Sequence, residues 1–301
     1  MRQRETAICI RTTDYSETSQ VVHFLTRGWG VVRLNAQGTK RPKSKSGGAI
    51  DLLGEGDLIF TASSRDSLGT LVEFTETVTH GDLRTDPRRL NAALYMIELV
   101  GAMLAEADPH PEVFDLLHNG LARLGQADSP VGAVLAYFQW RLLRHVGLMG
   151  ELKACVSCGR SVGGGGGSGR NVYFSSIQGG LLCGGCEGTA AEKYRVDGAA
   201  LAGLAALAAA EAGTKVSLRD KQALAANRVL AYHVTQQLGR ALKMARYAIQ
   251  PAGESQTADR DARDAGDATK GKEGEGSKTS GDAGPRPPGS DPKGDARDTG
   301  R

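Results

Sequence analysis

The chain has 301 residues, of which 40% are apolar, only 5% are aromatic and 41 are glycine, and its formal net charge is +3. No stretch approaches the roughly 18 apolar residues of a membrane-spanning helix, and MRQRETAICI lacks the apolar core of a signal peptide, so we expect a cytoplasmic protein without a membrane segment. From residue 251 onward acidic residues outnumber basic ones by two, so the preceding part carries +5 (+3 minus −2), which favours an anionic partner.

The first 80 residues predict a β domain. Five short segments rich in Val, Ile, Leu, Phe and Thr are separated by turn residues. Five strands in this length fit a small closed barrel such as an OB-fold. An SH3-like barrel fits almost as well from the pattern alone. The expected strands are 6–11, 20–26, 30–36, 57–62 and 70–79.

A cationic segment follows the third expected strand. Four cations fall within six residues, among glycine and hydroxyl residues. On a barrel rim this loop would line a groove that binds phosphate chains by counterion release. A solvated charged loop explains the same residues equally well. The cations of the segment are Lys40, Arg41, Lys43 and Lys45, and those that would extend the patch are Arg11, Arg27 and Arg33.

Aromatic side chains that would stack on nucleic-acid bases are few. Core packing is the commoner role of such side chains. A site poor in aromatic residues relies on charge and shows strong salt dependence. The aromatic candidates in the β region are Tyr15, Phe24, Trp29 and Phe60.

Near residue 86 the apolar spacing changes to that of amphipathic helices. We therefore predict an all-α domain over residues 84–250. Polar caps and prolines mark the helix starts. They predict helices that begin at Asp86-Pro87, Pro111, Ser129-Pro130, Asp197 and Ser217, the last of them running to about Tyr247.

Four cysteines form the sharpest motif, two C-x2-C pairs separated by 24 residues. This spacing is typical of tetrahedral zinc sites. Two disulfides or four incidental buried thiols are the alternatives, and reduced thiols in the cytoplasm favour the metal. We expect a structural Zn²⁺ module over residues 152–187, with residues 163–167 in a loop. Its ligands would be Cys155, Cys158, Cys183 and Cys186, while Cys9 would be a buried small residue.

Two further features concern function. Residues 251–301 contain no Val, Ile, Leu, Met, Phe, Trp, Tyr or Cys, so we predict a disordered tail. The sequence has no P-loop, no H-E-x-x-H and no G-x-S-x-G motif. A thiolate-closed zinc site also leaves no open position for catalysis, so we expect no enzyme.

The order of these motifs points to a known family. Residues 14–18 (DYSET), 24–30 (FLTRGWG), Arg33 and 38–45 (GTKRPKSK), followed by the cysteine quartet, resemble RecO, the bacterial recombination mediator. The resemblance covers residues 1 to about 250. It implies an α+β multidomain protein with an N-terminal five-stranded OB-fold barrel, followed by an all-α domain with an inserted four-cysteine zinc module.

The resemblance also implies activities and partners. RecO proteins bind single- and double-stranded DNA, anneal complementary strands, engage RecR and the tail of the single-strand binding protein, and help indirectly to load RecA. DNA binding of this kind would place the protein in the cytoplasm, in association with the nucleoid. The resemblance makes the DNA-contact candidates Arg27, Arg33, Lys40, Arg41, Lys43 and Lys45.

Two points stay open at the level of sequence. An acidic, apolar partner tail would need a pocket with a cationic rim. Cations on the predicted helices could form this rim, but ordinary surface charge explains them more simply. The alternative function is a zinc-ribbon protein-interaction module whose barrel binds RNA or protein. The candidate rim residues are Arg141 and Arg144, or Arg240, Lys243 and Arg246.

Overall fold

The computed structural model describes residues 1–41, 48–62, 68–150, 152–162, 171–211 and 213–250. The expectations for Lys43, Lys45, the glycine-rich loop at 163–167 and the tail from 251 therefore lie outside the described residues. Within the described ranges, no helix has both the length and the apolar character needed to cross a bilayer.

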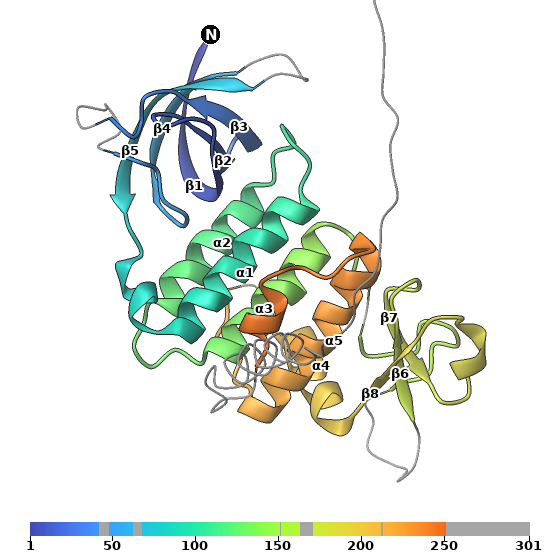
Figure 1. Cartoon of the computed structure of the whole chain (residues 1–301). Helices are drawn as coiled ribbons and strands as arrows, with labels where there is room; N and C mark the ends of the chain where they lie inside the picture. Colours follow the sequence, from blue (N-terminus) through green and yellow to red (C-terminus); the bar gives the residue numbers. More distant parts are fainter. Residues whose placement is uncertain (42–47, 63–67, 151, 163–170, 212, 251–301) are drawn as a thin grey trace, which may run out of the picture. The chain divides into compact units, whose positions relative to one another are not determined.

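Five strands close a barrel in the order β1-β2-β3-β5-β4 (Figure 1). Every neighbouring pair is antiparallel except β3 and β5, which run parallel. This closed five-stranded arrangement confirms the predicted OB-fold barrel. The strands are β1 (Arg2–Asp14), β2 (Gln20–Thr26), β3 (Gly30–Ala36), β4 (Glu55–Thr61) and β5 (Gly69–Val78).

The first strand is longer than predicted. It starts at Arg2, because residues 2–8 pair with β4 through the backbone. The side chains of residues 2–5 are polar and not buried, so no apolar alternation marks this part of the strand.

The apolar side chains of the barrel strands belong to two separate clusters. Inward-facing side chains such as Cys9, Phe24 and Phe60 fill the barrel itself. Outward-facing Ile8 and Leu25, with others from β1 and β3, instead join the core of the helical region. Burial raises the pKa of the Cys9 thiol, as expected for an inert small core residue. One face of the barrel is therefore buried against the helices.

The helical region confirms most predicted starts. Asp86 caps the first helix by accepting a hydrogen bond from the Arg88 amide (2.9 Å), and Asp197 caps the fourth through the Ala200 amide (2.7 Å). The third helix begins at Val131 without a side-chain cap. The helices are η1 (Gly81–Thr85), α1 (Pro87–Met103), α2 (Pro111–Leu124), α3 (Val131–His145), α4 (Gly198–Ala209), α5 (Asp220–Leu238) and α6 (Ala245–Ala248).

The prediction for the last helix was wrong at both ends. α5 begins at Asp220, where the Gln222 side chain accepts a hydrogen bond from the Arg219 amide (3.0 Å). It ends at Leu238 because Gly239 adopts a left-handed conformation, and the chain resumes as the separate short helix α6.

The cysteine module lies between α3 and α4 and contains a small sheet that the sequence did not predict. Its strands are β6 (Val172–Ser175), β7 (Gly180–Cys183) and β8 (Tyr194–Val196), and their order in the sheet is β7-β6-β8. The short helix η2 (Glu187–Thr189) lies between β7 and β8 in the sequence. β6 and β7 have four residues each and β8 has three, so each gives at most a weak signal of period two.

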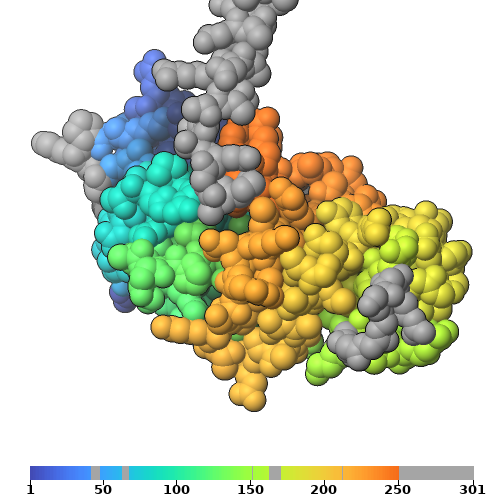
Figure 2. Space-filling model, turned by 90° about the horizontal axis from the view of Figure 1, so that it is seen from below, coloured from blue at the N-terminus to red at the C-terminus, as the bar shows by residue number. Residues whose placement is uncertain are grey.

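A buried histidine fixes the module to the helices. His233 of α5 donates from Nε2 to the Leu148 carbonyl (2.7 Å), so its Nδ1 accepts from the Ser176 hydroxyl (2.5 Å). Burial lowers the pKa of His233 and keeps it neutral, which this pairing requires. In Figure 2 the yellow module residues lie against the orange residues of α5.

Candidate functional site

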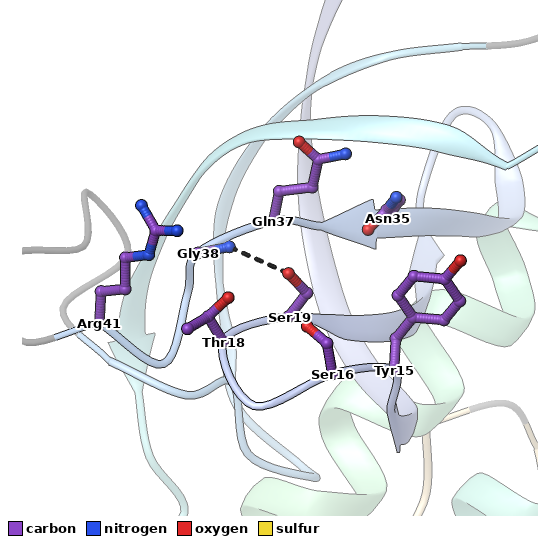
Figure 3. A pocket seen from close by; sticks show the side chains of 8 residues that line it. All are labelled: Tyr15, Ser16, Thr18, Ser19, Asn35, Gln37, Gly38 and Arg41. Atoms are coloured by element: carbon purple, nitrogen blue, oxygen red, sulfur yellow. Dashed lines mark hydrogen bonds between the residues drawn. The ribbon is translucent and has the colours of Figure 1, made fainter.

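The barrel carries a polar hollow of about 390 Å³ beside the start of the cationic loop. Figure 3 shows Tyr15 and Arg41 at opposite ends of it. Tyr15 is 71% exposed, so its ring is available for stacking, whereas Phe24 and Phe60 are fully buried. We call this feature the Tyr15 hollow; its lining residues are Tyr15, Ser16, Thr18, Ser19, Asn35, Gln37, Gly38 and Arg41.

Backbone contacts hold the two loops of the Tyr15 hollow together. The amides of Tyr15 and Ser16 donate to the Ser19 carbonyl (3.0 and 3.2 Å), which closes the β1–β2 turn. The Gly38 amide donates to the Ser19 hydroxyl, and the Lys40 amide donates to the Thr18 carbonyl (3.4 and 3.3 Å). Gly38 has φ +68°, a value that favours glycine. The cationic loop therefore starts from a fixed position against the turn.

A buried glutamine secures both ends of this loop. Gln20 of β2 is only 5% exposed. Its amide oxygen accepts from the Ile50 amide (3.0 Å) and the Thr39 hydroxyl (3.3 Å), and its amide nitrogen donates to the Ile50 carbonyl (3.4 Å). Sequence reasoning missed this residue. The available signal was a lone amide at the start of the largely apolar strand QVVHFLT.

The predicted DNA-contact cations occupy different environments. Arg41 lines the Tyr15 hollow and has no ion-pair partner among the residues described. Lys40 pairs with Asp14 at the end of β1 (2.6 Å). Lys43 and Lys45 lie outside the described residues.

Two of the predicted cations pair with carboxylates of the helical region. Arg27 forms a bidentate ion pair with Asp115 of α2, in which Nε and Nη2 donate to Oδ1 and Oδ2 (3.1 and 2.9 Å). This pair lowers the pKa of the Asp115 carboxyl. Arg33 pairs with Glu106 in the α1–α2 connection (3.2 Å). Neither carboxylate was singled out by the sequence, because both lie far from the arginines along the chain.

A histidine–glutamate–histidine cluster lies at the same junction. Glu55 of β4, 5% exposed, contacts His118 Nδ1 of α2 (2.8 Å) and lies 3.5 Å from His80 Nε2. Burial raises the pKa of Glu55, but its contacts with the two histidines and their charge outweigh burial, so the pKa is lowered. These histidines showed no ligand spacing in the sequence.

The four cysteines of the module converge. Their Sγ atoms all lie within 4.8 Å of one another. Tetrahedral zinc with Zn–S bonds of about 2.3 Å places its sulfurs about 3.8 Å apart, and Cys158 Sγ lies 3.7 Å from Cys183 Sγ. All four are free thiols, so the alternative of two disulfides is wrong. The cluster could hold a metal ion.

The electrostatics of the cluster also fit a cation. A hydrogen bond from the Arg160 amide lowers the pKa of Cys158 to about 6. A contact with Ser157 lowers the pKa of Cys186, but the neighbouring sulfurs outweigh it and raise the pKa to about 11. Four thiolates at this distance repel one another, and a divalent ion at their centre would remove that repulsion.

The barrel, the helical region and the four-thiol module together define the class of the protein. The family model described as "Recombination protein O N terminal" matches residues 1–78, and that described as "Recombination protein O C terminal" matches residues 84–246. The chain therefore belongs to the recombination protein O (RecO) family, a family of DNA repair proteins.

Individual relatives agree over most of the chain. The DNA repair protein RecO of Anaeromyxobacter sp. (strain Fw109-5) is 33% identical over 253 residues, which cover 82% of this chain and 95% of that protein. The protein of the same name from Anaeromyxobacter dehalogenans (strain 2CP-C) is 35% identical over 191 residues, covering 62% and 70%. The relative in Myxococcus xanthus (strain DK1622) is 29% identical over 245 residues, covering 80% and 95%.

Proposed function

We propose that this chain is a non-enzymatic recombination mediator that binds DNA through the barrel. The observation that carries the proposal is the Tyr15 hollow. Its opposite ends hold an exposed aromatic ring and an arginine that has no ion-pair partner within the described ranges. The hollow lies on the β1–β2 turn, and OB-folds commonly bind oligonucleotides through that loop and the face of strands 2 and 3.

The lining of the hollow suits a single strand bound without sequence readout. A base stacked on Tyr15 would contribute roughly 1–3 kcal/mol, whatever its identity. The guanidinium of Arg41 is suited to the phosphate that follows. Between them lie uncharged hydroxyl and amide groups, and Asn35 Oδ1 has no hydrogen-bond partner among the described residues.

The six predicted cations divide into two groups in this proposal. Arg41, with Lys43 and Lys45 two and four residues further along the sequence, would contact phosphates directly. The other three must exchange a carboxylate partner for a phosphate. Exposed ion pairs are worth only about 0–1 kcal/mol, so that exchange costs little. The second group is Arg27, Arg33 and Lys40.

Fluorescence anisotropy with labelled oligothymidylate tests the interface. We expect Arg41→Glu and Tyr15→Ala each to weaken binding at least several-fold, and Arg41→Glu also to reduce the salt slope by about one or more. Arg228→Glu, a charge reversal at an exposed position of α5, is the matched control and should bind as the natural protein does. Unchanged affinity in Arg41→Glu and Tyr15→Ala would refute the assignment.

We extend the proposal to the metal and the partners. The cysteine cluster would hold one structural Zn²⁺ that stabilises the helical domain, proposed as residues 84–250, while the barrel domain, residues 1–80, contacts DNA. RecR, the tail of the single-strand binding protein and, indirectly, RecA are the partners that family membership supports.

Annealing of complementary strands coated with single-strand binding protein tests the mediator role. We expect this protein to accelerate annealing of the coated strands, most strongly at low salt, because phosphate contacts weaken as salt rises. Affinity for single-stranded DNA no greater than for an unrelated polyanion such as heparin would instead favour the protein-interaction alternative.

A further inference from the structure

Three basic side chains form a row across the outer face of the barrel. Arg11 of β1 lies opposite His23 of β2, and His23 lies opposite Arg33 of β3. The residues flanking His23 and Arg33 (Val22, Phe24, Val32 and Leu34) all point into the barrel core. Since successive side chains of a strand point to opposite faces, His23 and Arg33 point outward.

An irregularity in β1 places the third member of the row. The register shifts between Cys9 and Arg11, so that the chain has one extra residue there. Ile10 packs into the core shared with the helices, while Arg11 is exposed opposite His23. Without the shift, Ile10 would occupy the place of Arg11 in the row.

The row continues into the Tyr15 hollow. Asn35, which lines the hollow, follows Arg33 by two residues and so shares its face of β3. Its cross-strand partner Val21 is likewise two residues from His23. One step along the strands, roughly 6–7 Å, therefore separates the row from the hollow.

The surroundings of His23 oppose its protonation in the free protein. Partial burial is the largest cause that lowers its pKa, followed by the charges of Arg11 and Arg33, while Glu106 on the α1–α2 connection acts weakly in the opposite direction. At neutral pH the side chain is therefore an uncharged imidazole between two cations.

We propose that His23 is a proton-coupled phosphate contact, which takes up a proton from solvent when a single strand lays a phosphodiester across the row Arg11–His23–Arg33. This inference rests on the proposed DNA-binding function and adds a residue and a regulation to it. A phosphate oxyanion beside the ring favours the imidazolium, which then donates a charge-assisted hydrogen bond. The two arginines, which disfavour the imidazolium in the free protein, are neutralised by the same ligand.

The direction of the pH effect follows from linkage. The pKa of His23 is lowered in the free protein and would be raised in the complex. Affinity therefore increases as pH falls through the pKa that His23 has in the complex, and the gain is complete once pH lies below its pKa in the free protein. Between the two, uptake of one proton increases affinity by at most about tenfold per pH unit.

Binding to oligothymidylate at constant ionic strength, from about pH 8 to about pH 5.5, tests this coupling. We expect His23→Gln to lose most of the increase in affinity on acidification. His145→Gln is the matched control, because His145 of α3 also has a lowered pKa beside two arginines but lies outside the barrel. It should retain the full increase. Calorimetry in buffers of different ionisation enthalpy should find proton uptake that His23→Gln reduces.

A second measurement does not depend on the His23 variant folding. The proton resonance of the His23 ring should titrate at higher pH after oligothymidylate is added, and Arg11→Gln should raise its pKa in the free protein. Undiminished pH dependence in His23→Gln, or an unmoved His23 titration in the complex, would overturn the inference. Absence of binding by the natural protein at every pH would instead refute the proposed function itself.

Discussion

Replacement of Glu55 by glutamine tests the junction between the barrel and the helices. The change keeps the shape of the side chain but removes a buried negative charge that contacts His118 (2.8 Å) and lies near His80 (3.5 Å). A hydrogen bond to a charged group contributes about 1.5–3 kcal/mol and a neutral one about 1 kcal/mol. We therefore expect Glu55→Gln to lower the free energy of unfolding by about 1–2 kcal/mol at pH 7.

The pH dependence of this loss provides a second test. The pKa of Glu55 is lowered in the folded protein, so its stabilising contribution is fully present above its ordinary value of 4.5. It is lost as pH falls through the folded-state pKa. Urea unfolding should therefore show the gap between the natural protein and Glu55→Gln closing below about pH 4.5.

An exposed carboxylate provides the control. Glu17→Gln, at an exposed position of the β1–β2 turn, should change the free energy of unfolding by less than about 0.5 kcal/mol. Equal stability of Glu55→Gln and the natural protein at pH 7, or a gap that persists unchanged at pH 4, would refute the electrostatic account of the junction.

Two further predictions concern the metal and the backbone. Elemental analysis should find close to one zinc per chain, and Cys155→Ser should lower both the metal content and the melting temperature, since metal binding is coupled to folding; zinc loss without a change in melting would contradict the structural role. Gly30→Ala should destabilise the protein by at least about 2 kcal/mol in urea unfolding, because Gly30 has φ +68° and an added Cβ would lie 2.1 Å from the Asp108 carbonyl oxygen. Gly198→Ala, with nothing within 4 Å, should not.

Local signals explain what the sequence could predict. The break between the expected strands 20–26 and 30–36 and the prolines at the starts of α1 and α2 mark element boundaries directly, and those boundaries were confirmed. The C-x2-C pairs predicted a cluster because each pair needs only one tight turn. The first residues of β1 carry no apolar pattern, so their pairing with β4 had no local signal.

Partners distant in sequence explain what it could not predict. The cations of the barrel were visible in the sequence, but the carboxylate facing Arg27 is 88 residues away. The same holds for the contacts of Glu55 with His118 and of Ser176 with His233, 63 and 57 residues apart. Only the fold brings such groups together, and no periodicity encodes their pairing.

The apolar core shared by the barrel and the helices has a mechanical consequence. Ile8, Ile10, Leu25 and Val31 lie in the helical cluster, so a fragment ending near residue 80 would expose all four to water. Each such exposure costs about 1.5–3 kcal/mol. The described residues belong to one compact unit, so the barrel and the helices share a core instead of forming separate units. If a DNA strand bound at the barrel were under tension, the helical core would therefore carry part of the load.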